Sequence, residues 1–119
     1  TFELLPEKAR LARETLALAE IGDRVELREE NAIAGLDAID GVSFCFLDAE
    51  KDVYLSCWRK LQPKLVPGAL VLADNVISHR DEMTDFLDAV EADGDMDSVV
   101  VPIGMGVLLA RRWGGGAAT

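Results

Sequence analysis

The spacing of apolar residues predicts helices that alternate with strands along the chain. Apolar residues recur at steps of three and four from Leu5 to Ala19, which predicts a helix over residues 5–21 that stops at Gly22. In chain order the other predicted elements are a short strand at 25–28, a loop with a short helix at 30–40, strands at 42–47 and 69–73, helices at 51–64 and 80–92, and strands at 98–101 and 107–110. This alternation is typical of an α/β sheet.

Two of the predicted strands are almost entirely apolar, and each is followed by an acid. The run over residues 42–47 ends at Asp48, and the run over residues 69–73 ends at Asp74. Strands of this kind are buried on both faces, as in a parallel sheet with helices on both faces. Such sheets bind ligands outside the carboxyl ends of their strands, so the residues after each strand are the candidates for function.

The candidate residues at these strand ends are suited to a divalent cation. If the two strands are neighbours, Asp48, Asp74 and Asn75 converge at one edge of the sheet. Two carboxylates and an amide oxygen are hard ligands that suit Mg²⁺, Mn²⁺ or Ca²⁺. Lys51 follows in the first turn of the next helix and can point back over the same place. A nearby metal ion would lower the pKa of its amine, so that Lys51 could act as a base.

Each candidate also has a purely structural explanation. Asp48 could be the N-cap of the following helix, Asp74 and Asn75 could form a turn, and Lys51 could be a solvated lysine. Glu3 follows what looks like the end of a strand, where an acid can hold ribose hydroxyls, but it could equally cap the helix after it. These alternatives remain open from the sequence.

Composition and charge narrow the class of protein. The 119 residues include 22 acidic and 12 basic ones, giving a net charge of −10, which argues against binding to nucleic acid or to an anionic membrane surface. No apolar run approaches the roughly 20 residues that span a bilayer. Cys45 and Cys57 form no CxxC motif and suit buried thiols in the reducing cytosol, with a disulfide as the alternative. We therefore expect a cytoplasmic protein.

Five segments resemble one enzyme family in the order in which it carries them. Phe44–Tyr54 resembles the "F-L-D-A-x-K-x-x-Y" segment of the small S-adenosylmethionine-dependent O-methyltransferases of the catechol and caffeoyl-coenzyme A type. Pro67–Val76 resembles their "P-G-G-x-x-x-x-D-N-V", and Pro102–Val107 their closing "P-x-G-x-G". Thr1–Glu3 resembles their second strand and its acid. Glu30–Ala32 stands where they carry "G-D-A".

The resemblance implies a role for each candidate residue. Glu3 would hold the ribose of S-adenosylmethionine, Asn31 and Ala32 would flank its adenine, and Asp48 would also lie against the cofactor. Asp48, Asp74 and Asn75 would hold Mg²⁺ or another divalent cation, which lowers the pKa of the hydroxyl to be methylated. Lys51 and Asp48 would be the catalytic residues, with Lys51 taking the proton. Tyr54 would pack against or steady the segment.

The sequence also departs from the family pattern. Glu30-Asn31 replaces Gly-Asp, and the tryptophan and glycine often found after "D-N-V" are absent, which suggests a different acceptor; His79 could contact it or could be a surface loop residue. The family's first strand and glycine-rich loop would precede Thr1. We therefore expect residues 1–112 to be the C-terminal part of a methyltransferase domain and residues 113–119 a flexible tail.

The resulting expectation is a Rossmann-like methyltransferase sheet of the α/β class. It is mostly parallel with an antiparallel last strand, has helices on both faces, and lacks its N-terminal strand and glycine loop. The expected function is methyl transfer to a hydroxyl of a small, diol-like aromatic acceptor, by a homodimer that binds neither nucleic acid nor membranes. Two alternatives are a non-catalytic remnant that serves as an interaction or dimerisation module and a methyltransferase that uses no metal.

Overall fold

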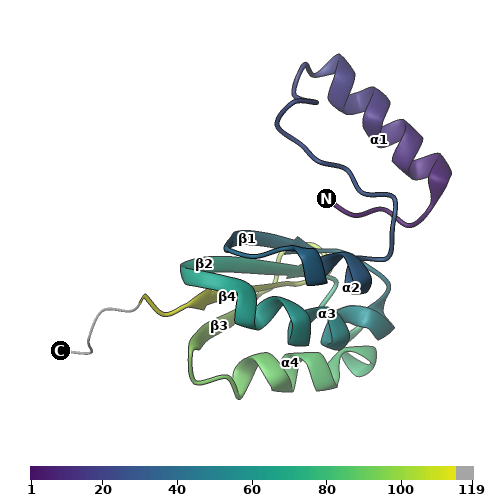
Figure 1. Ribbon diagram of the computed structural model, residues 1–119. Helices are drawn as coiled ribbons and strands as arrows, with labels where there is room; N and C mark the ends of the chain where they lie inside the picture. The colour runs from purple at the N-terminus through teal and green to yellow at the C-terminus, as the bar shows by residue number, and fades with distance from the viewer. Residues whose placement is uncertain (115–119) are drawn as a thin grey trace. The chain divides into compact units, whose positions relative to one another are not determined.

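A computed structural model describes residues 1–114 of the 119-residue chain. The chain divides into two compact units, Thr1–Ala38 and Ile39 onwards, which are described separately (Figure 1). The predicted tail, residues 113–119, lies mostly outside the described residues. Trp113, which lies within them, donates its backbone N–H to the carbonyl of Asp95 at 2.9 Å.

The first unit begins with helix α1, Pro6–Leu18, which has proline in its first turn. The sequence predicted that this helix stops at Gly22, and this is wrong. The backbone turns at Glu20, which has a left-handed φ of 57°. The N–H of Ile21 then reaches back to the carbonyl of Leu16 at 3.1 Å, the bond that closes a Schellman C-cap.

The rest of the first unit is built around a short strand contact. The strand predicted at 25–28 is reduced to a single parallel bridge between Phe2 and Arg28. Helix α2, Ala32–Gly35, continues into the 3₁₀ turn η1, Leu36–Ala38. The Phe2 ring lies so close to Gly35 that a Cβ there would stand 2.1 Å from it, so this position requires glycine. The start of the chain is therefore packed against α2.

The second unit is a four-stranded sheet with two α-helices. Its strands and helices are β1 (Val42–Leu47), α3 (Tyr54–Leu61), β2 (Leu65–Asp74), α4 (Thr84–Glu91), β3 (Met96–Val101) and β4 (Val107–Arg112). Short 3₁₀ turns flank the helices at η2 (Lys51–Val53), η3 (Gln62–Lys64) and η4 (Arg80–Glu82). Strand β2 begins before the predicted residue 69, because Gly68 adopts a φ of 84° and the register against β1 shifts without breaking the strand.

The sheet has the order β1-β2-β4-β3. Strands β1 and β2 are parallel, whereas β4 is antiparallel to both β2 and β3. Strands β1, β2 and β3 consequently run in the same direction and only the last strand, β4, runs against them. The predicted mostly parallel sheet with an antiparallel last strand is confirmed.

Both α-helices of this unit lie under the same face of the sheet (Figure 1). Tyr54, Trp58 and Phe86 are buried there with the strand residues that alternate inward. Within residues 39–114 the opposite face has no helix, although helices were expected on both faces. That face instead exposes large apolar side chains of three strands: Phe44, Phe46, Leu70 and Val99. None of the described helices has both the length and the apolar character needed to cross a membrane.

Candidate functional site

The candidate site lies where β1 and β2 end. Leu47 pairs with Ala73 in the parallel ladder, so the next residues along each strand, Asp48 and Asp74, leave the sheet at the same edge. Asn75 follows at once. The two strands are therefore the neighbours that the cation hypothesis required.

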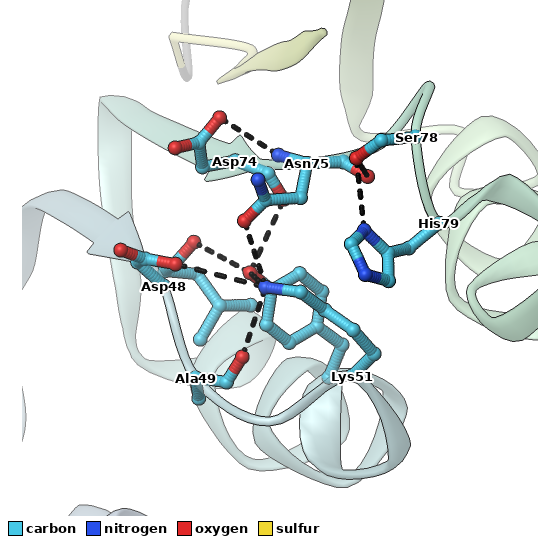
Figure 2. A network of polar contacts seen from close by, with 9 residues as sticks. Asp48, Ala49, Lys51, Asp74, Asn75, Ser78 and His79 are labelled. Atoms are coloured by element: carbon cyan, nitrogen blue, oxygen red, sulfur yellow. Dashed lines mark hydrogen bonds and ion pairs between the residues drawn. The ribbon is translucent and has the colours of Figure 1, made fainter. Parts of the chain in front are cut away.

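Lys51 lies at the centre of the polar network at this edge (Figure 2). Its Nζ donates hydrogen bonds to the carbonyl of Ala49 at 3.0 Å, to the hydroxyl of Tyr54 at 3.1 Å and to Oδ1 of Asn75 at 2.9 Å. Oδ1 of Asp48 is 3.6 Å away. An ammonium group has three N–H donors, and all three are used here. Lys51 is thus not a solvated lysine: its side chain is only 14% exposed.

The surroundings of Lys51 keep it charged. Burial lowers the pKa of Lys51, but the hydrogen bond and charge interaction with Tyr54 and the carboxylate of Asp48 more than offset this, so its pKa is raised. Burial raises the pKa of Tyr54, although the ammonium of Lys51 opposes the shift. The network therefore contains an ammonium and a neutral phenol.

Tyr54 ties the two strand ends together. Its side chain is fully buried and its ring meets Phe86 edge-on at a centroid distance of 5.4 Å. Its hydroxyl lies 3.2 Å from the carbonyl of Leu47, the last residue of β1, and 3.2 Å from that of Asp74, the last residue of β2. The expected packing role of Tyr54 is confirmed, and its hydroxyl in addition contacts the ends of both strands that carry the acids.

Asp74 and Asn75 form a turn as well as a candidate ligand pair. Asn75 has a φ of 66°, a left-handed conformation that asparagine adopts more readily than most residues. Oδ1 of Asp74 accepts the backbone N–H of Asn75 at 2.7 Å. The amide oxygen of Asn75 instead points toward Lys51 (Figure 2). The turn fixes the direction of both side chains.

His79 lies at the far end of the same loop. Its backbone N–H donates to the carbonyl of Asn75 at 3.0 Å. Its Nδ1 lies 2.8 Å from the hydroxyl of Ser78, which is also 3.3 Å from that carbonyl. The imidazole is directed from its loop toward the side on which Lys51 lies (Figure 2). His79 is therefore an ordered loop residue beside the candidate site.

The loop that precedes β4 is hydrogen-bonded to the loop that follows Asn75. The backbone N–H of Val76 donates to the carbonyl of Gly106 at 3.1 Å, and those of Ile77 and Ser78 donate to the carbonyl of Met105 at 3.0 and 3.2 Å. Gly106 has a φ of 86°, and a Cβ there would stand 2.3 Å from Cγ1 of Ile77. The sequence marked this segment as a family motif but did not predict its contact with the other loop. The signal for its role was the "P-x-G-x-G" spacing.

The oxygens at this edge fit a hard divalent cation by their chemistry. Asp48, Asp74 and Asn75 supply two carboxylates and one amide oxygen, and the side chain of Asp48 is 52% exposed and so accessible to an ion from solvent. The N-cap of the turn after β1 is Glu50, so Asp48 is not spent on that role. The described residues hold no group of three or more His, Cys, Asp or Glu side chains suited to a metal. The candidate set has only two such residues and relies on Asn75 for its third oxygen.

Three of the predicted cofactor contacts, Glu3, Asn31 and Ala32, lie in the first unit, whereas Asp48 belongs to the second. Oε1 of Glu3 accepts the N–H of Leu5 at 3.0 Å, just before α1. Oδ1 of Asn31 accepts the N–H of Ile33 at 2.9 Å, so Asn31 is the N-cap of α2, of which Ala32 is the first residue. The N-cap of α1 is Leu5, which has no side-chain cap, so Glu3 bonds the backbone just before the helix and does not cap it; contact of Glu3 with a cofactor stays a prediction.

Comparison with known proteins gives the family of the chain. A family model described as O-methyltransferase matches residues 1–113. The chain belongs to the O-methyltransferase family. A relative, caffeoyl-CoA O-methyltransferase 1 of Eucalyptus globulus, is 27% identical over 130 residues, covering 89% of this chain and 53% of the relative. The chain thus spans about half the length of that enzyme.

Solved structures share the fold of this family member. A putative O-methyltransferase from Klebsiella pneumoniae aligns with a TM-score of 0.87 at 25% identity, covering 95% of this chain and 60% of that one. An O-methyltransferase from Bacillus cereus, solved in complex with SAH, aligns with a TM-score of 0.83 at 21% identity over 94% of this chain and 61% of that one. The Rossmann-like methyltransferase fold expected from the sequence is confirmed.

Proposed function

We propose that the protein to which this chain belongs transfers a methyl group from S-adenosylmethionine to a hydroxyl of a small, diol-like aromatic acceptor, assisted by a divalent cation. The observation that carries the proposal is the convergence of Asp48, Asn75 and Lys51 at the ends of two parallel strands. Membership of the O-methyltransferase family and the SAH in the Bacillus cereus structure support the cofactor.

The proposed roles divide between binding and proton transfer. Asp48, Asp74 and Asn75 would hold the cation, for which Mg²⁺ is the proposed ion. When bound, the cation supplies positive charge that favours the deprotonated form of the acceptor hydroxyl. Lys51 would take the proton of that hydroxyl. Because the network holds Lys51 as an ammonium with a raised pKa, Lys51 must first lose a proton, which a divalent cation nearby would favour, before it can accept that of the hydroxyl.

Four residues are the proposed cofactor contacts. Glu3 would accept hydrogen bonds from the ribose hydroxyls, Asn31 and Ala32 would lie against the adenine, and Asp48 would also contact the cofactor. Oε1 of Glu3 and Oδ1 of Asn31 each accept a local backbone N–H. Glu3 keeps its second carboxylate oxygen, and Asn31 keeps its side-chain amide NH₂ group, for contact with the cofactor. We further propose a cytoplasmic homodimer. The proposed acceptor is a small molecule, and the net charge of −10 on this chain disfavours nucleic acid.

The test is a calorimetric titration of S-adenosylmethionine, with and without Mg²⁺, into the full-length gene product and into this chain alone. Transfer of a labelled methyl group to caffeoyl-CoA and to catechol is then measured in Mg²⁺ and in EDTA. The proposal predicts binding by the full-length product and transfer that EDTA abolishes. Binding with transfer that survives EDTA would favour a metal-independent methyltransferase. Absence of cofactor binding by the full-length product would favour a non-catalytic interaction module.

A further inference from the structure

The ammonium of Lys51 contacts two of the three residues proposed to bind the cation. It donates to Oδ1 of Asn75 at 2.9 Å and lies 3.6 Å from Oδ1 of Asp48. These are the oxygens that a divalent cation would need. In the protein without the cation, the positive charge at this edge of the sheet is therefore that of Lys51.

An ammonium and a divalent cation cannot share these oxygens without cost. Both are positive, and a metal ion binds such oxygens at roughly 2.0–2.6 Å, which would bring it close to Nζ. Like charges at this separation repel strongly where water is scarce, and the Lys51 side chain is only 14% exposed. The two cations are therefore expected to compete for Asn75 and Asp48.

The network also provides a place for the ammonium to withdraw to. Besides Asn75, Nζ donates to the carbonyl of Ala49 and to the hydroxyl of Tyr54, both of which belong to its own segment of chain. Neither is a proposed ligand of the cation. Release of Asn75 thus removes one of three hydrogen bonds and leaves the other two in place, which makes the exchange a small movement of a flexible side chain.

We propose that Lys51 holds the cation site in the metal-free protein, neutralising Asp48 and orienting Asn75, and that a divalent cation must displace it, so that Lys51 sets the cation affinity of the site. This rests on the cation site of the proposed function. It gives Lys51 a role separate from proton transfer, because the competition exists without cofactor or acceptor.

The experiment compares the binding of MgCl₂ and MnCl₂ alone, by calorimetry, to the wild type and to Lys51→Met. Removal of the competing charge is expected to tighten the dissociation constant about tenfold, within the range of typical coupling between two ligands. Lys51→Arg retains a positive charge and is expected to bind no more tightly than the wild type. The matched control is Lys64→Met, which removes another largely buried lysine, one that pairs with Ile39 and Asp40 instead.

Thermal unfolding, with and without Mg²⁺, gives a second readout. The metal-free Lys51→Met protein should unfold at a lower temperature than the wild type, and Mg²⁺ should raise its midpoint by more than it raises that of the wild type. Lys51→Gln, which keeps hydrogen-bonding capacity, replaces Lys51→Met if the latter does not fold.

The outcomes separate this inference from the proposed function. Binding by the Lys51→Met or Lys51→Gln protein that equals or falls below that of the wild type overturns the inference and leaves the cation site standing. Absence of binding by the wild type and by both variants overturns the inference together with the cation site. If cation binding tightens as much in Lys64→Met as in Lys51→Met, the effect comes from net charge alone, and the inference is overturned.

Discussion

Replacement of Gly106 by alanine tests how the loop after Asn75 is positioned. Gly106 has a φ of 86°, and a Cβ added to it would stand 2.3 Å from Cγ1, 2.7 Å from Cβ and 2.8 Å from Cδ1 of Ile77. Carbon atoms pack best at about 3.5–4.0 Å, so Gly106→Ala must push Ile77 away. Ile77 belongs to the loop that begins directly after the candidate cation ligands.

Two costs add in this variant. A left-handed backbone costs a non-glycine residue about 1–2 kcal/mol. Forcing an extra carbon into a packed contact adds about 1–3 kcal/mol. We therefore expect Gly106→Ala to lower the free energy of unfolding by about 3 kcal/mol, as the sum of these two contributions. Gly104 offers a matched control, since it has a φ of 55° but no atom within 4 Å of an added Cβ. Gly104→Ala should lose only the backbone contribution, about 1–2 kcal/mol.

Urea unfolding of both variants gives these free energies, and Mg²⁺ titration shows whether the loop shift reaches the site. We expect Gly106→Ala to weaken Mg²⁺ binding, because it displaces the loop that begins after the candidate ligands. Gly104→Ala should leave the dissociation constant for Mg²⁺ within about twofold of the wild type, well short of the tenfold change that corresponds to about 1.4 kcal/mol. Ile77→Ala, combined with Gly106→Ala, removes two of the three close atoms and should restore part of the lost stability. If the two glycine variants unfold alike and bind Mg²⁺ alike, the close approach of Gly106 to Ile77 does not position the site.

Three further predictions concern the rest of the fold. Tyr54→Phe should lower the free energy of unfolding by about 1–2 kcal/mol in urea, because it removes the one O–H donor that the carbonyls of Leu47 and Asp74 share; an unchanged value would show that the hydroxyl is dispensable. Burial raises the pKa of the Cys45 thiol to about 11, so the protonated thiol stabilises the fold fully below pH 9, and this stabilisation is lost as the pH rises toward 11. In urea unfolding, the free energy of unfolding of Cys45→Ala should therefore fall less steeply over this pH range than that of the wild type. An equally steep fall would contradict this. Glu20→Gly should raise the free energy of unfolding by about 1 kcal/mol, because glycine adopts the left-handed φ of this position without strain. Gly22→Ala should not lower it. If Glu20→Gly does not stabilise and Gly22→Ala destabilises, the helix ends at Gly22.

The arrangement of the sheet was predictable because burial leaves a direct mark on the sequence. The largely apolar strands over residues 42–47 and 69–73 are neighbours as expected, and their following acids marked the edge where Asp48 and Asp74 emerge. The same pattern wrongly suggested that both faces are covered, since Phe44, Phe46 and Leu70 are exposed. The family resemblance then indicated that the last strand is antiparallel. Helix ends were less predictable, since Glu20 rather than a glycine takes the left-handed position.

The contacts that organise the site could not be predicted from spacing. Spacing predicted that Lys51 points back toward Asn75, 24 residues away, but not that the ammonium donates a hydrogen bond to the amide oxygen. The close approach of Gly106 to Ile77 likewise depends on two loops brought together by the β2–β4 ladder. A sequence pattern records which residues are buried. It does not record which side chains lie within hydrogen-bonding distance of one another at a strand end.

The most direct test of the central claim is an anomalous diffraction map from crystals of the full-length protein grown with Mn²⁺, which takes the same oxygen ligands as Mg²⁺. The account predicts one strong peak at the ends of β1 and β2, within about 2.6 Å of oxygens from Asp48, Asp74 and Asn75, with Nζ of Lys51 withdrawn from Asn75. A map with no peak there, or with Lys51 still bonded to Asn75 and the ion elsewhere, would contradict it.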